Sequence, residues 1–256
     1  MFIDSHCHLE MEEYDKDRQA VIRRAEEKGV RYMLTVATEE QHFDRAIGII
    51  EQNPAVYGAL GIHPHNAKYY SQELQGRIIS LARHPKVVAY GEIGLDFFKD
   101  YSPRKTQMEA FAAQVAAAKD AGLPIIIHSR EARRETLEIL KGADLGDNPV
   151  VIHCFSYDLA TAKTMLDMGF YLSITGVVTY KNSPLADIIR HLPLGSLLAE
   201  TDSPFLTPHP HRGKRNEPSL VANVYERIAQ VQKRTIEEVC ETIGSTFRAL
   251  FLRGTG

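Results

Sequence analysis

The chain has 256 residues, 44% of them hydrophobic and 25% charged, which is the composition of an ordinary globular protein. Its formal net charge of −3 excludes a general electrostatic attraction to nucleic acid or acidic membranes. A polyanionic substrate would therefore need a local source of positive charge. Three cysteines without paired spacing argue against a disulfide framework and are typical of a reducing compartment.

The N-terminal sequence MFIDSHCHLE has acids and histidines where a signal peptide has its apolar core. No run in the sequence approaches the ~18 apolar residues of a membrane span. We therefore expect a cytoplasmic protein that has no membrane partner.

Short apolar runs alternate with longer amphipathic segments along the chain. Rich in Val, Ile and Leu, the runs are typical of parallel strands buried on both faces. The expected strands are Phe2–Ile3, Tyr32–Val36, Val56–Leu60, Val87–Tyr90, Pro124–Ile127, Pro149–Ile152, Tyr171–Ile174 and Leu197–Ala199. The expected helices include Asp15–Lys28, Arg104–Ala121, Ala132–Lys141 and a further helix, Ile236–Phe251, near the end of the chain.

Histidines and acids follow six of the eight expected strands, and this distribution selects the fold. In a barrel the carboxyl ends of all strands converge, whereas an open sheet spreads them along one edge. We therefore predict an α/β protein with a TIM (βα)8 barrel and an extra C-terminal helix, and a doubly wound sheet is the alternative. No linker or composition shift divides residues 1–256, so one domain is expected.

The strongest single motif is His6-Cys7-His8 at the end of the first expected strand. Side chains alternate along a strand, so His6 and His8 face the same side and can reach one metal ion. A pair of structural histidines is the alternative. Four imidazoles and two carboxylates at strand ends exceed what one tetrahedral ion needs, which favours a two-metal site. The six candidate ligands are His6, His8, Glu92, His128, His153 and Asp202.

Several motifs resemble those of the TatD family of metal-dependent hydrolases. They are FIDSHCHL at residues 2–9, GIHPH at 61–65, GEIGLD at 91–96, HCFS at 153–156, ETDSP at 200–204 and RGKRNEP at 212–218. They cover nearly the whole chain, and no ligand position departs from the pattern. The resemblance implies an amidohydrolase-type barrel, two divalent cations and DNase activity, largely as trimming of DNA from the 3′ end.

The resemblance also implies a role for each ligand. One cation is expected at His6, His8 and Asp202 and the other at His128 and His153, with Glu92 bridging both. The cations would polarise the scissile phosphate and lower the pKa of a bridging water, so that hydroxide is available near neutral pH. Glu92 and Asp202 are thus catalytic residues, and Asp202 is the expected general base. Nitrogen ligands favour Zn or Mn over Mg, although the family is often assayed with Mg.

Other residues are candidates for contacts with the substrate. His63 is assigned to positioning the phosphate as a third catalytic residue, with a structural turn histidine as the alternative, and His65 is a second candidate. Arg212, Lys214 and Arg215 lie in the loop after the last expected strand, where barrels often bind phosphate. A solvated loop is the alternative for these three. Weaker candidates are Arg130, Arg133 and the aromatic residues Phe97, Phe98, Phe155 and Tyr157, which more often serve in packing.

Three functions remain open at this point. The first is a divalent-metal-dependent deoxyribonuclease of 3′-to-5′ polarity that acts on single strands or 3′ ends and needs no obligate protein partner. The second is an amidohydrolase or esterase acting on a carbonyl bond, such as a cyclic amide or a D-aminoacyl-tRNA ester. The third is a non-catalytic metal or nucleic-acid binding protein. The basic loop and the family resemblance favour the first.

Overall fold

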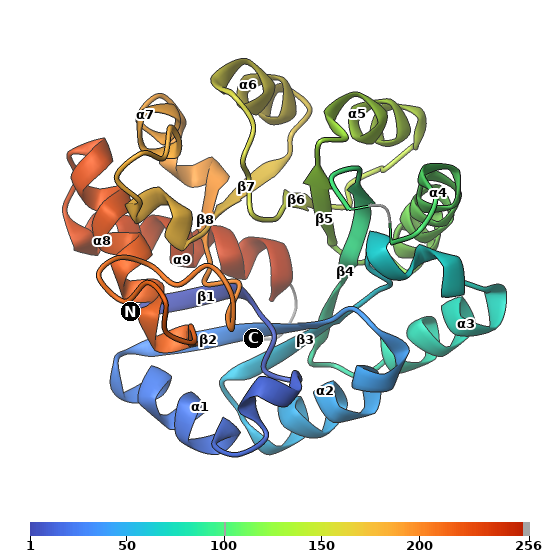
Figure 1. Ribbon diagram of the computed structural model, residues 1–256, viewed down its shortest axis with the longest axis horizontal. Helices are drawn as coiled ribbons and strands as arrows, with labels where there is room; N and C mark the ends of the chain where they lie inside the picture. Colours follow the sequence, from blue (N-terminus) through green and yellow to red (C-terminus); the bar gives the residue numbers. More distant parts are fainter. Residues whose placement is uncertain (100, 253–256) are drawn as a thin grey trace.

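The computed structural model describes residues 1–99 and 101–252, and it confirms the predicted TIM barrel (Figure 1). Eight parallel strands pair in chain order, and helices surround them. The strands are β1 (Phe2–Cys7), β2 (Val30–Ala37), β3 (Val56–Leu60), β4 (Val87–Asp96), β5 (Ile125–Arg130), β6 (Val150–Ile152), β7 (Tyr171–Ile174) and β8 (Leu197–Ala199).

The helices follow the strands in the order that a barrel requires. They are α1 (Arg18–Glu27), α2 (Glu40–Gln52), α3 (Gln72–Leu81), α4 (Arg104–Asp120), α5 (Arg133–Gly142), α6 (Leu159–Asp167), α7 (Leu185–Ile189), α8 (Val221–Gln232) and α9 (Ile236–Phe251). Short 3-10 helices lie at Glu12–Tyr14, Pro64–Tyr69, Gly176–Thr179, Leu194–Ser196 and Pro218–Leu220. None of the helices in the described ranges has the length and apolarity needed to cross a membrane.

The C-terminal helix α9 is the predicted addition to the eight strand–helix units. It packs against α8, β1 and β8. Its start is fixed by a capping box in which the Thr235 side chain accepts the Glu238 N–H and the Glu238 side chain accepts the Thr235 N–H. The buried face of α9 includes Val239, Ile243 and Phe247. Each such side chain contributes about 1.5–3 kcal/mol of hydrophobic stabilisation on burial.

The barrel closes where the chain beyond β8 pairs with β1. The Asp202 N–H donates to the His6 carbonyl at 2.9 Å, and the His8 N–H donates to the Ser203 carbonyl at 2.8 Å. The buried Asp4 carboxylate accepts the backbone N–H and the hydroxyl of Thr201, at 2.8 and 2.6 Å. These bonds place Asp202 beside the two histidines of β1.

At their carboxyl ends, strands β1, β4 and β5 extend well beyond the expected strands, and β2 is slightly longer at both ends. Apolar runs marked their starts, but β1 continues to Cys7 and β4 continues to Asp96. The glycines of GEIG do not end β4, because Ile93 and Gly94 pair with Ile127 and His128 of β5. Glu92 therefore lies inside a strand, not at its end, and its side chain is buried within the barrel.

Gly94 is required by close contact between β4 and β5. Its φ is +141°, and a Cβ at this position would lie 2.0 Å from the His128 carbonyl oxygen. We expect Gly94→Ala to destabilise the protein by about 3 kcal/mol, because backbone cannot yield as a side chain does. That corresponds to a fall of roughly 6–12 °C in the melting temperature measured by calorimetry.

The matched control is Gly76→Ala in α3, where an added Cβ meets nothing within 4 Å. Replacing a helical glycine by alanine should raise stability by up to about 1 kcal/mol. Equal melting temperatures for the two variants would contradict the assigned packing of Gly94.

Candidate metal centre

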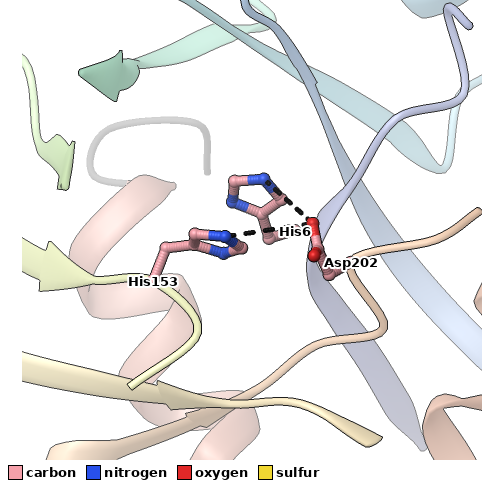
Figure 2. Close-up of side chains that lie close together, drawn as sticks. All are labelled: His6, His153 and Asp202. Carbon is pink, nitrogen blue, oxygen red and sulfur yellow. Dashed lines mark ion pairs between the residues drawn. The ribbon is translucent and has the colours of Figure 1, made fainter. Parts of the chain in front are cut away.

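The six predicted ligands converge at the carboxyl ends of the strands. A cavity of about 880 Å³ opens there, and five of the six line it. The sixth, His6, is buried at 1% exposure and lies against them. Figure 2 shows His6 of β1, His153 after β6 and Asp202 after β8 pointing toward one another. The lining ligands are His8, Glu92, His128, His153 and Asp202.

The first group of ligand atoms lies at the β1 side. His6 Nε2 is 3.3 Å from His8 Nε2 and 3.4 Å from Glu92 Oε2. Asp202 Oδ1 lies 3.4 Å from His8 Nε2 and 3.9 Å from His6 Nε2. Two imidazole nitrogens and two carboxylate oxygens therefore surround one point.

The second group lies on the other side of Glu92. Its Oε1 is 2.8 Å from His128 Nδ1, 3.5 Å from His153 Nε2 and 3.6 Å from His63 Nε2. The two oxygens of this carboxylate thus have different nearest imidazoles. His153 Nε2 also lies 3.9 Å from Asp202 Oδ1, so the two groups adjoin at His153. Such an arrangement suits a carboxylate that serves two cations.

The spacing of these atoms fits divalent cations. Zinc–nitrogen and zinc–oxygen bonds of about 2.0–2.2 Å at tetrahedral angles place neighbouring ligand atoms roughly 3.3–3.6 Å apart. Most of the separations given above lie in or near this range. The ring nitrogen of His6 that faces away from the group, Nδ1, is buried and has no hydrogen-bond partner. The polar contacts of the His6 ring are therefore all made through Nε2, which is the atom that would bind a cation.

Comparison with known proteins identifies the family. Residues 3–252 match the family model described as TatD related DNase. The chain belongs to the TatD family. A Bacillus subtilis relative named as the metal-dependent hydrolase YabD is 41% identical over 252 residues, covering 98% of this chain and 99% of that protein. A relative from Escherichia coli named YcfH, also as a metal-dependent hydrolase, is 37% identical over 97% of this chain and 95% of its own.

Solved structures agree with this assignment. The crystal structure of YjjV, a TatD homologue from Escherichia coli, superimposes with a TM-score of 0.92 at 33% identity, covering 98% of both chains. A TatD-family protein from Entamoeba histolytica has a TM-score of 0.89 at 22% identity over 98% of this chain and 97% of that one. That second likeness shows the fold alone. This protein is accordingly a metal-dependent hydrolase of the TatD family.

Outer carboxylates and carbonyls orient the imidazoles of the TatD-family site. His8 Nδ1 donates to the Val36 carbonyl at 2.8 Å, so its Nε2 carries the free lone pair. His153 Nδ1 lies 2.8 Å from Glu200 Oε1, which also accepts the Cys154 N–H at 2.7 Å. In both rings the nitrogen that faces the cavity is left for a ligand.

Asp96 has the same effect on His128 from the opposite side. Its Oδ2 accepts from His128 Nε2 at 3.2 Å and from His65 Nε2 at 2.9 Å. Its Oδ1 accepts the backbone N–H groups of Phe98 and Lys99. Because Asp96 accepts at His128 Nε2, Nδ1 is the ring nitrogen that faces Glu92 and becomes available to a cation when its proton leaves.

Asp96 and Glu200 contact the candidate ligands His128 and His153, and neither was predicted from the sequence as a site residue. A usable signal was present for Asp96, because side chains four residues apart in a strand share a face. Asp96 is four residues beyond Glu92 in β4, and Glu200 is two residues before Asp202. Both were read only as parts of family motifs.

The buried carboxylates of the TatD-family site favour the binding of positive charge, as protons on the histidines or as metal ions. Burial opposes charge on the histidines, but Glu200, Glu92 and Asp202 raise the pKa of His153 to about 10. The carboxylates of Asp202 and Glu10 likewise raise the pKa of His8 despite its burial. Although burial acts in the other direction, the neighbouring histidines hold the pKa of Glu92 well below its usual range.

The predicted substrate contacts occupy different places. His63 and His65 line the cavity, and Arg212, Lys214 and Arg215 do not. Arg215 instead pairs with Asp17 at 2.7 Å, and Arg212 lies over the Tyr180 ring at 4.2 Å. The positively charged side chains that line the cavity are those of Lys68, Lys99 and Arg130. Of the predicted aromatic residues, Phe97 and Phe155 are buried and Phe98 is exposed.

Metal binding should depend on pH with a definite sign. Neighbouring carboxylates raise the pKa values of His8 and His128 above the usual value and that of His153 to about 10, so proton binding at these rings is favoured in the metal-free protein. A cation must displace such protons, so its apparent affinity should rise with pH toward the His153 pKa of about 10. Each displaced proton gives up to about tenfold per pH unit. Titration calorimetry with Zn²⁺ or Mn²⁺ in two buffers would measure the release, and affinity independent of pH would contradict this charge balance.

Asp96→Ala should weaken binding at the His128 position. The change removes the acceptor that orients His128, and loss of such an outer partner typically weakens metal binding about 10–100-fold. Elemental analysis after dialysis against a graded chelator would measure the stoichiometry, with the expected loss confined to one of two cations. The control is Asp167→Ala, an exposed carboxylate at the end of α6. Full retention of both cations in Asp96→Ala would show that His128 needs no such support.

Proposed function

We propose that this TatD-family hydrolase is a divalent-metal-dependent deoxyribonuclease that removes nucleotides from the 3′ end of DNA in the cytoplasm. The observation that carries the proposal is the Glu92 carboxylate, one of whose oxygens lies nearest His6 and the other nearest His128. The family description, TatD related DNase, supports DNA as the substrate. The proposed ligand division is His6, His8 and Asp202 for one cation, His128 and His153 for the other, and Glu92 for both.

Two bound divalent cations would supply the charge that polarises a phosphodiester and lowers the pKa of an attacking water. Asp202 is suited to accept the proton of that water. Its carboxyl pKa lies below the usual value despite burial, because His153, His8 and His6 stabilise the anion, so it is ionised at neutral pH. It is 13% exposed at the cavity, which leaves it accessible to a substrate.

His63 is suited to donate a hydrogen bond to the phosphate. Its Nδ1 accepts the backbone N–H of His65, so the proton of the neutral ring is on Nε2, which faces the cavity. Burial lowers the pKa of His63 well below its usual value, and the ring stays neutral at pH 7. A ring that carries its proton on the cavity side is a donor rather than a metal ligand, which supports the positioning role.

The proposal is tested by comparing three substrates on one preparation. The metal-loaded protein should release nucleotides from 3′-labelled single-stranded DNA, and a chelator should abolish the release. A D-aminoacyl-tRNA and a cyclic amide test the amidohydrolase or esterase alternative in parallel. Cleavage of either of these two without cleavage of DNA would overturn the deoxyribonuclease proposal.

Asp202→Asn separates chemistry from folding. Loss of a general base should lower the rate of DNA hydrolysis by at least ~10²–10⁴-fold. The melting temperature of the metal-free protein should fall only modestly, because the neutral amide loses the attraction of the Asp202 carboxylate to His153, His8 and His6 but keeps its shape. The affinity for single-stranded DNA should be retained, since the positively charged side chains of Lys68, Lys99 and Arg130 at the cavity are unchanged.

Turnover, melting temperature and affinity should be measured together, with Asp187→Asn on α7 as the exposed control. Near-normal turnover in Asp202→Asn would require another base. A collapsed melting temperature would instead make Asp202 a structural residue.

A further inference from the structure

Exposed aromatic rings are concentrated at the mouth of the metal cavity. In residues 1–99 and 101–252, the exposed large apolar side chains are Met1, Tyr69, Phe98, Tyr101 and Phe205. The four rings all lie in segments that follow β3, β4 or β8, at the end of the barrel that carries the ligands. Tyr69, Phe98 and Tyr101 are 66%, 50% and 57% exposed. Clustered exposed apolar surface of this kind marks a binding site.

Three of these rings are interleaved with positive charge. Arg130 Cζ lies 3.9 Å from the centroid of the Phe98 ring. Lys99 Nζ lies 5.5 Å from Phe98 and 5.9 Å from Tyr101. Lys68 Nζ lies 5.2 Å from Tyr69 and donates to the Tyr101 carbonyl. We call this set the cation–aromatic rim: Lys68, Tyr69, Phe98, Lys99, Tyr101 and Arg130.

The rim is tied to the barrel by buried polar groups. The Asp96 carboxylate accepts the N–H groups of Phe98 and Lys99 at 3.0 and 2.9 Å. The buried Ser102 hydroxyl donates to the His65 carbonyl and accepts the Lys68 N–H, so it links the segments after β3 and β4. The backbone that carries these side chains is therefore fixed, so a ligand need not order it on binding.

We propose that the cation–aromatic rim binds an unpaired segment of single-stranded nucleic acid, with bases stacked on its rings and phosphates near its cations. This proposal rests on the proposed deoxyribonuclease function, because that function places the scissile bond of the bound strand at the metal site. It also places the strand on the β3–β5 side of the cavity. The predicted contacts at Arg212 and Arg215 lie elsewhere, on partners of their own.

The combination of rings and cations selects this ligand over others. A base in a duplex is stacked on its neighbours and offers only its edges, whereas an unpaired base offers a face to an exposed ring. A small cyclic amide would fit within the cavity without reaching Phe98, which does not line it. A phosphate chain without bases would use the three cations and leave the rings in water.

The test measures binding separately from cleavage. The metal-loaded full chain is titrated with a fluorescein-labelled oligothymidylate that carries phosphorothioate linkages, and affinity is read by anisotropy. A strand of the same length with abasic sugars carries the phosphates without the bases. Phe98→Leu and Tyr101→Leu keep apolar bulk but lose the ring, and Phe98→Tyr restores a ring at the first position.

Each leucine variant should bind the thymidylate strand about tenfold more weakly, equivalent to about 1.4 kcal/mol and within the range for base–aromatic stacking. Neither change should alter affinity for the abasic strand, and Phe98→Tyr should bind as the natural protein does. Lys99→Met should weaken both strands and lower the slope of log affinity against log salt by about 0.7. The charge-matched control is Lys105→Met on α4, which should leave the slope unchanged because Lys105 does not line the cavity.

Equal loss on both strands in the leucine variants, or equal affinity of the natural protein for thymidylate and abasic strands, would overturn stacking. Tighter binding of a blunt duplex than of the single strand would overturn it as well. A protein that binds thymidylate in a ring-dependent manner yet cleaves no DNA would instead contradict the proposed function and leave the rim assignment intact.

Discussion

The buried Glu92 carboxylate is the group around which the site is organised. A carboxylate at 3% exposure is costly unless opposite charge and hydrogen bonds compensate it. His6, His63, His128 and His153 surround it, and together they supply that compensation. Protons on the histidines and divalent cations can each supply the positive charge that the Glu92 carboxylate requires. The ligand atoms therefore already lie close together around Glu92 before a metal binds.

This constraint explains why so many polar residues are placed behind the ligands. A buried imidazole presents a lone pair to the cavity only if its other nitrogen is directed elsewhere. For His8 the other nitrogen donates to the Val36 carbonyl, and for His128 it faces Asp96. The outer groups therefore decide which atom of each ring is available, and the strand positions alone do not.

The sequence was sufficient for the barrel and for the convergence of the six candidate ligands. The strand–helix alternation and the placement of histidines after apolar runs follow from local patterns, and the family motifs strengthened them. The extent of β4 was not predictable from its apolar run, because Gly94 is accommodated by contact with β5 that only the assembled sheet provides. The pairing of Arg215 with Asp17 was equally hidden, since it joins residues 198 positions apart. Charge in a loop indicates affinity for anions but does not indicate which anion is nearest.

The closure of the barrel has a consequence for when metal can be acquired. His6 and Asp202 belong to the first strand and to the segment after the last one, and backbone hydrogen bonds between these segments bring them together. A nascent chain therefore has no complete site until about four-fifths of it has been synthesised and the barrel has closed. Under the proposed ligand division, a cation held by His6 and Asp202 would act as a cross-link between the two ends, and closing so long a loop costs much entropy. Occupancy of that position, unlike the position at His128 and His153, would then report that the first and last strands have been brought together.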